Sequence, residues 1–81
     1  MIVFVTANGS GKLIRVVDRI AGQEVLNSFV DAGSTVQLNV ASNNGQDGDI
    51  DLYKRLQAQN PWTVDRSDYT VRVNENMGVD D

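Results

Sequence analysis

The segment Asp31–Ala41 constrains the fold of this chain more than any other stretch. Apolar and polar residues alternate strictly over positions 35–40, and the apolar ones are Val36, Leu38 and Val40. Successive side chains of a β-strand point to opposite faces, so this pattern predicts a strand with one buried face. A single strand cannot bury its own apolar face, which means that other segments must pair with it or pack on it.

Further strands are predicted wherever β-branched and other apolar residues gather between turn residues. These segments are 2–6, 12–18, 25–30, the beginning of 49–59, a short edge piece at 62–64, and 69–73. The predicted fold class is therefore all-β, a small antiparallel β-sandwich or barrel-like domain of about six strands. We expect residues 1–81 to form this single domain, with an acidic C-terminal tail over 74–81.

Two segments allow more than one interpretation. Residues 19–30 could form a helix, or a hairpin whose turn lies at 21–23. We prefer the hairpin because Gly22 inside a helix would cost about 1 kcal/mol. Residues 50–59 begin with the alternation of a strand but continue with helix-forming residues up to Pro61, which would end a helix. A short helix near 50–59 therefore stays an alternative to a strand there.

The residue types that the chain lacks exclude several kinds of function. Its 81 residues include neither cysteine nor histidine, so the usual ligands of structural zinc are absent. The same absence removes the commonest general base and the strongest nucleophile of enzymes. We therefore predict that the protein is not an enzyme and that it uses no cofactor.

The charges of the chain argue against nucleic acid and membranes as partners. Lysine and arginine number 7 against 11 acidic residues, which gives a net charge of −4. The cations are scattered along the sequence, whereas a phosphate-binding surface needs them clustered on a positive face. The apolar run at residues 1–5 is too short for a signal peptide or a membrane span. We therefore expect synthesis in the cytoplasm without a signal peptide, and the sequence leaves the final compartment open.

Oxygen-bearing side chains recur along residues 43–51, a pattern that could wrap a hard cation such as Ca²⁺. The candidate ligands are Asn43, Asp47, Asp49 and Asp51. The pattern differs from an EF-hand because Lys54 stands where that motif requires a bidentate glutamate. We therefore prefer an ordinary hairpin loop here and keep a Ca²⁺ site as the alternative.

Apolar and aromatic residues supply the candidate binding or interface positions. The candidates are Val16, Val17, Tyr53, Trp62 and Tyr69. The two valines belong to the segment 12–18, which is apolar on both faces, as is typical of a central strand or of a strand with one face in an interface. The three aromatic residues could stack on sugar rings, although in so small a domain such residues more often anchor a core or an interface.

Two short motifs carry a family resemblance. Gly48–Tyr53, with the sequence GDIDLY, follows Ala32–Val36, with the sequence AGSTV. Together these motifs, which cover less than a third of the chain, resemble the central part of pre-peptidase C-terminal domains. Those domains are small β-sandwiches appended to secreted bacterial enzymes. The resemblance implies a β-sandwich fold and a module that binds a ligand.

The sequence supports two functional hypotheses from different classes. The first is a non-enzymatic structural or interaction protein, a small accessory subunit that docks on a larger protein assembly and associates with copies of itself. A virion decoration protein or minor structural protein is an example. The alternative is a β-sandwich module that binds polysaccharide or protein with the help of Ca²⁺. A third hypothesis, an acidic inhibitor that mimics nucleic acid, is weaker because the cations are scattered among the acidic residues.

Overall fold

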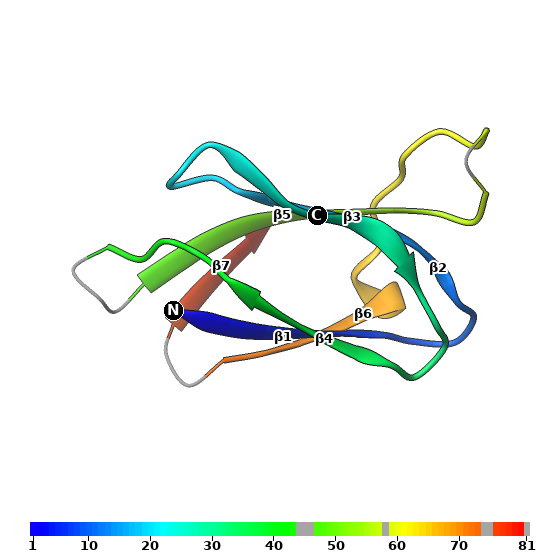
Figure 1. The fold of residues 1–81 in the computed structure, drawn as a ribbon, viewed down its shortest axis with the longest axis horizontal. Coiled ribbons are helices and arrows are strands. Elements are labelled where there is room, and N and C mark those ends of the chain that lie inside the picture. The colour runs from blue at the N-terminus through cyan, green and yellow to red at the C-terminus, as the bar shows by residue number, and fades with distance from the viewer. Residues whose placement is uncertain (44–46, 58, 74–75, 81) are drawn as a thin grey trace.

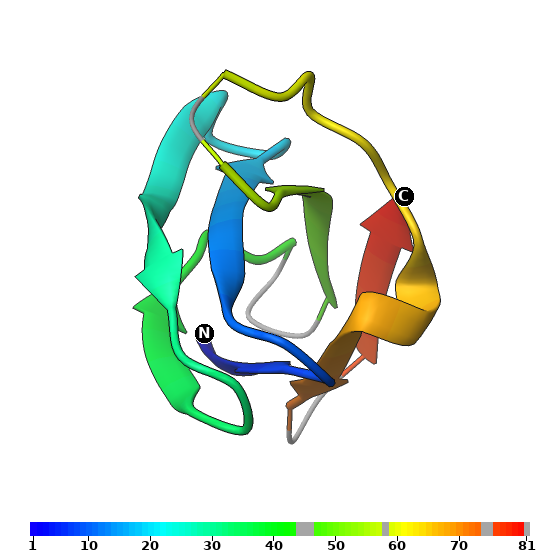
Figure 2. The same cartoon turned by 90° about the vertical axis from the view of Figure 1, so that its right-hand side faces the viewer.

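Two β-sheets face each other across one apolar core in the computed structural model of the chain, which describes residues 1–43, 47–57, 59–73 and 76–80 (Figure 1). The strands are β1 (Ile2–Ala7), β2 (Lys12–Asp18), β3 (Gln23–Val30), β4 (Thr35–Asn39), β5 (Asp47–Arg55), β6 (Tyr69–Arg72) and β7 (Asn76–Asp80), and a 3-10 helix, η1 (Arg66–Asp68), precedes β6. The first sheet has the order β4-β1-β6 and the second the order β3-β2-β5-β7. Seen from the end, the strands surround the core, which gives the sandwich a barrel-like cross-section (Figure 2). The predicted all-β fold class is confirmed.

Neighbouring strands run antiparallel except at one edge. β1 is antiparallel to β4 and β6, and β2 is antiparallel to β3 and β5. β7 instead runs parallel to β5, with Asn76 opposite Asp47 and Asp80 opposite Asp51. Residues 76–80 of the expected acidic tail thus form a strand, because their main chain pairs with the edge of β5.

β2 lies at the centre of the second sheet, and its inner face is buried from end to end. Its inward side chains are at most 2 % exposed, and they belong to Lys12, Ile14, Val16 and Asp18. Its outward side chains are half-buried, and they belong to Leu13, Arg15 and Val17. The two apolar faces seen in the sequence thus divide into a core face and an outer face. Val16 belongs to the core, because alternate residues of a strand point to opposite sides.

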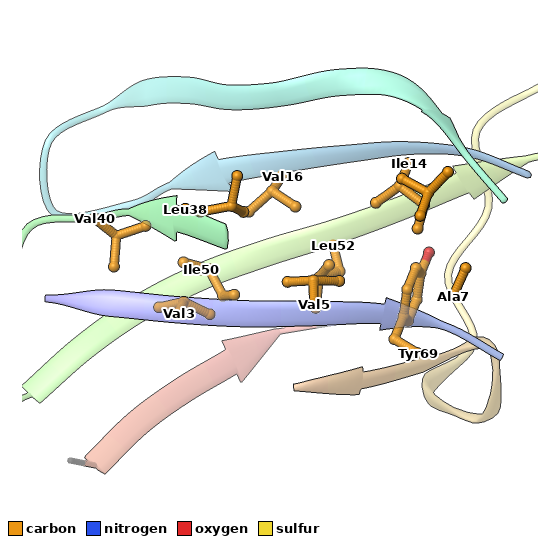
Figure 3. Close-up of a cluster of buried hydrophobic side chains, with 11 residues drawn as sticks. Val3, Val5, Ala7, Ile14, Val16, Leu38, Val40, Ile50, Leu52 and Tyr69 are labelled. Carbon is orange, nitrogen blue, oxygen red and sulfur yellow. The ribbon is translucent and has the colours of Figure 1, made fainter. Parts of the chain in front are cut away.

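Both sheets contribute to the core. Its buried apolar residues are Val3, Val5, Ala7, Ile14, Val16, Val30, Leu38, Val40, Ile50, Leu52 and Tyr69. Figure 3 shows these side chains gathered between the strands of the two sheets. Leu38 and Val40 of the alternating segment lie among them, as predicted, whereas Val36 is only half-buried. Burial of each larger side chain stabilises the fold by about 1.5–3 kcal/mol.

The ambiguous segment 19–30 forms the preferred hairpin. Gly22 has a φ of +68°, which glycine adopts without strain, and its N–H donates to the carbonyl oxygen of Asp18 at 2.8 Å. Asp18 Oδ1 accepts hydrogen bonds from the N–H groups of Ile20 and Ala21 at 3.0 and 3.1 Å. These bonds satisfy the backbone of the turn and end β2 at Asp18.

The alternative of a short helix near 50–59 is wrong for the described residues, because β5 continues as a strand to Arg55. Its pairing with β2 extends over the same length and places Arg55 opposite Leu13. Cross-strand pairing here overrides the helix preference of the local sequence. Among the described residues η1 is the only helix, and none there is long and apolar enough to cross a membrane.

We expect Val16→Thr and Val17→Thr to differ in stability although they make the same chemical change. At position 16 the hydroxyl enters the core without a partner, which should lower the free energy of unfolding by about 1–3 kcal/mol. At position 17 the hydroxyl points outward, and the change should stay within about 0.5 kcal/mol. Urea unfolding followed by circular dichroism measures both. Equal losses would contradict the assignment of the two faces.

Candidate functional site

The outer face of the second sheet places aromatic, apolar and arginine side chains next to one another. Cross-strand rows run from β3 through β2 to β5, and the residues of one row share a face. The rows are Phe29-Leu13-Arg55, Asn27-Arg15-Tyr53 and Glu24-Val17-Asp51. We call these rows, together with Trp62 in the loop after β5, the arginine–aromatic face.

Phe29 is a large apolar residue that this face leaves exposed. It is 55 % exposed although it lies on a strand beside Leu13. Its ring lies against Gly11, where a Cβ atom would come within 2.7 Å of Phe29 Cζ. Glycine at position 11 therefore gives the ring room to lie along the sheet. An aromatic ring held in this way offers apolar area to a partner at a low cost in side-chain entropy.

The loop after β5 brings Trp62 back over the end of that strand. Main-chain hydrogen bonds join Lys54 and Thr63 in both directions, each with an N–O distance of 2.8 Å. The edge piece predicted at 62–64 is thus a single bridge. The guanidinium carbon of Arg55 lies 4.1 Å from the centroid of the Trp62 ring, which is a cation–π contact. In Figure 1 this loop projects from the rest of the fold.

A hollow of about 210 Å³ lies at the base of this loop. Its lining residues are Lys54, Arg55, Leu56, Asn60, Pro61 and Thr63. Leu56 is 53 % exposed, so apolar surface lies open beside the Arg55 guanidinium. The loop therefore extends the arginine–aromatic face beyond the edge of the sheet.

A larger hollow of about 420 Å³ lies on the other sheet. Its lining residues are Phe4, Val71, Arg72 and Val73. The Arg72 guanidinium carbon is 5.7 Å from the Phe4 ring centroid, a looser contact than the one at Trp62. The chain continues from Val73 into residues outside the described ranges.

Arg15 makes a comparable contact in the next row and is also paired with a carboxylate. Its guanidinium carbon lies 5.1 Å from the centroid of the Tyr53 ring. Its Nε donates a hydrogen bond to Glu24 Oε2 at 2.6 Å. This hydrogen bond holds the pKa of the Glu24 carboxyl below its ordinary value. In this row the chain itself therefore supplies both the ring on which the arginine stacks and the carboxylate that accepts its hydrogen bond.

On the inner side of the same sheet an ion cluster joins β2 and β5 to η1. Lys12 is 1 % exposed, and its Nζ lies 3.2 Å from Asp68 Oδ1 and 2.6 Å from the carbonyl oxygen of Asn8. Lys54 Nζ lies 2.7 Å from the other carboxylate oxygen of Asp68. One carboxylate therefore faces two ammonium groups. It also fixes the end of the loop that carries Trp62, because Asp68 closes η1 directly after that loop.

The predicted calcium ligands extend from a residue that precedes β5 to the middle of that strand. They are Asn43, Asp47, Asp49 and Asp51. Arg19 approaches two of them, with Nε 3.8 Å from Asp49 Oδ2 and Nη1 3.8 Å from Asp51 Oδ1, so an arginine supplies positive charge there. Within the described ranges, which omit 44–46, no group of three or more acidic side chains could hold a metal ion. Binding of Ca²⁺ stays a prediction.

The predicted binding residues separate into two sets. Val16 and Tyr69 lie in the core, at 0 % and 7 % exposure, because both point between the sheets. Val17, Tyr53 and Trp62 are half-buried on the arginine–aromatic face. The structure thus brings three of the five together on one surface.

Sequence reasoning missed several members of this face, among them Leu13, Phe29 and Arg55. The alternation within 12–18 would have placed Leu13 on the same side as Val17, because the two are four residues apart on one strand. The other two depend on register. Phe29 and Arg55 come next to Leu13 only through the pairing of β2 with β3 and β5, which no local pattern specifies.

No protein-family model, no curated protein and no solved structure matches the chain. The resemblance to pre-peptidase C-terminal domains is therefore limited to the two short motifs Ala32–Val36 and Gly48–Tyr53.

We expect Asp68 to make the stability of the fold depend on pH. The Lys54 ammonium, and then that of Lys12, hold the pKa of Asp68 below its ordinary value of 3.8, although burial acts in the opposite direction. A carboxyl with a lowered native pKa stabilises the fold above its unfolded pKa, and this contribution is lost as the pH falls through the native pKa. The free energy of unfolding should therefore fall from about pH 5 downward.

Asp68→Asn tests the cluster directly. It leaves Lys12 buried without its carboxylate, so it should lower the free energy of unfolding at neutral pH by about 3 kcal/mol. The double variant Lys12→Met, Asp68→Asn removes the buried charge as well and should recover part of that loss. Both variants should lose stability less steeply than the parent in urea titrations between pH 7 and pH 3. A single variant with unchanged stability and an unchanged pH profile would contradict this role.

Proposed function

We propose that the protein is a non-enzymatic accessory subunit that docks on a larger protein assembly through the arginine–aromatic face. A virion decoration or minor structural subunit is one example of such a role. The proposal rests on the side chains that the second sheet presents outward, and above all on the exposure of Phe29 beside Leu13 and Arg55.

The composition of this face supports protein binding. Tryptophan, tyrosine and arginine are the residues that most often dominate the binding energy of protein interfaces. Here Arg15, Tyr53, Arg55 and Trp62 lie close together beside Phe29. The guanidinium groups and aromatic rings of this face do not gain or lose protons near neutral pH, so they suit the binding of a partner rather than acid–base catalysis.

The outer face of the first sheet has a different composition. Threonine and amide side chains occupy much of it, for example Thr6 between Thr35 and Thr70, and among the described residues it carries one arginine–aromatic pair, Arg72 with Phe4. The hydroxyl oxygens of Thr6 and Thr35 lie 2.7 Å apart and hydrogen-bond to each other. Ile2, 49 % exposed, is the large aliphatic residue on this side. The second sheet carries two closer pairs, Arg15 with Tyr53 and Arg55 with Trp62, together with the exposed Phe29, which favours it as the docking side.

The side chains of the docking face are held before a partner arrives. Arg15 is fixed between Tyr53 and Glu24, and Arg55 is stacked on Trp62. Ordering a long arginine side chain on binding costs about 0.5–1.5 kcal/mol, and these contacts reduce that cost. A face arranged in this way can bind tightly over a small area, which suits a domain of 81 residues.

Affinity capture with matched variants tests the docking face. The tagged protein, Phe29→Ser and Ile2→Ser are each used to capture proteins from a lysate of the natural source. Both variants replace an exposed apolar residue by serine, one on each sheet. We expect one abundant protein at a fixed ratio with the parent and with Ile2→Ser. Its recovery should fall about tenfold or more with Phe29→Ser, as expected for an aromatic hot spot.

Two results would overturn the proposal. One is that no protein is enriched by the parent over a tag-only control. The other is that Phe29→Ser recovers its partner as well as Ile2→Ser does, which would move the docking site away from the arginine–aromatic face. Circular dichroism of both variants establishes that each has kept the fold.

A further inference from the structure

We propose that Arg55 and Trp62 form a carboxylate-binding site, which takes an acidic side chain of the partner that is flanked by an apolar one. This inference rests on the proposed docking function and specifies the chemistry that the same face would recognise.

The Arg15 row provides an internal comparison. There the chain itself completes the arrangement, because Arg15 stacks on Tyr53 and is closed by the carboxylate of Glu24 at 2.6 Å. Arg55 stacks on Trp62 at 4.1 Å, which is closer than the 5.1 Å between Arg15 and Tyr53. Among the residues that the structure describes, no carboxylate pairs with Arg55. The Arg55 row therefore lacks the carboxylate that Glu24 supplies in the Arg15 row.

The hydrogen-bonding state of Arg55 points in the same direction. Its Nε is buried and has no hydrogen-bond partner. Arg55 as a whole is half-buried, so part of its side chain is open to solvent. A carboxylate can bind two guanidinium N–H groups side by side, which an ammonium group cannot match. The planar stack on Trp62 already orients the guanidinium for such a ligand.

The local charge also calls for an anion, although the whole chain has a net charge of −4. At this end of the second sheet lie three cations, Lys12, Lys54 and Arg55, and Asp68 is the carboxylate that contacts two of them. Exposed Asp65 is the other carboxylate close enough to interact with Lys54. The carboxylates of β5 lie in its first half and at its middle, where Arg19 contacts Asp49 and Asp51. No described carboxylate forms an ion pair with Arg55, so a partner can neutralise its charge.

The surroundings of Arg55 define the rest of the ligand. Leu13 lies opposite Arg55 on β2, and exposed Phe29 lies beyond it on β3. On the other side Leu56 is 53 % exposed at the hollow below the loop. A carboxylate bound to Arg55 would therefore have apolar surface on both sides. We infer that the partner presents a glutamate or aspartate next to an aliphatic side chain.

NMR titration with a defined peptide tests this inference without the natural partner. The probe is the blocked peptide acetyl-Glu-Leu-Glu-Leu-amide, and its control has glutamine in place of glutamate. We expect the glutamate peptide to shift the Nε–H signal of Arg55 and the indole N–H signal of Trp62. The glutamine peptide should bind about tenfold more weakly, because it lacks the charge.

Three variants give the test its specificity. Arg55→Gln should abolish the response, and Arg55→Lys, which keeps the charge but loses the planar fork, should weaken binding about tenfold. Arg72→Gln removes the same charge from an arginine stacked on Phe4 in the other sheet, and it should leave the affinity within about twofold of the parent. Equal responses to the two peptides, a response that persists in Arg55→Gln, or an equal loss in Arg72→Gln would each overturn the site.

The two proposals can fail separately. Peptide binding that depends on Arg55, together with an empty capture, would keep the carboxylate site and remove the docking function. A partner whose recovery depends on Phe29 but is unchanged by Arg55→Gln, together with no peptide response, would keep the docking face and remove the carboxylate site.

Discussion

The inner face of β2 begins on a buried lysine and ends on a buried aspartate, and both charges have to be satisfied for the sheets to close. Lys12 and Asp18 are 1 % and 2 % exposed, and leaving either charge without partners would cost several kcal/mol. Lys12 finds its partners in Asn8 and Asp68. Asp18 accepts three main-chain hydrogen bonds, two within its own turn and one from Ala41 at 2.7 Å.

These two anchors connect segments that no sheet pairing joins. Asp18 ties the turn after β2 to the residues that follow β4, and therefore links the second sheet to the first. Lys12 ties the start of β2 to η1, which lies between the Trp62 loop and β6. Between the anchors the inner face of β2 is occupied by Ile14 and Val16. With its inner face filled, the strand presents its remaining side chains outward on a fixed backbone, and the arginine–aromatic face follows from this.

Much of the fold could be predicted because period-two alternation is local. The strand at Thr35–Asn39 and the hairpin around Gly22 follow from patterns within a few residues. β7 was missed as a strand, although Met77 and Val79 alternate with polar neighbours, because its charges are typical of a tail. The buried state of Lys12 could not be predicted, since its carboxylate lies 56 positions away in the sequence.

The candidate site was harder to predict than the fold. Alternation divides a strand into two faces but does not say which face is inside, so Val16 and Val17 stood as equal candidates. Aromatic type alone did not separate Tyr69, which is buried in the core, from Tyr53 on the outer face. Arg55 is recognisable as a site residue only once the loop has returned Trp62 to it. Local sequence patterns cannot predict a site that forms only through strand register and the path of a loop.

Cross-saturation NMR of the complex shows which sheet face of the protein contacts the partner. Saturating the protons of the captured partner attenuates signals of the labelled protein only where the two chains touch. We expect attenuation of the Leu13 and Val17 methyl groups and of the Trp62 indole, with Ile2 unaffected. Attenuation centred on Ile2 and the other outward residues of the first sheet would contradict it.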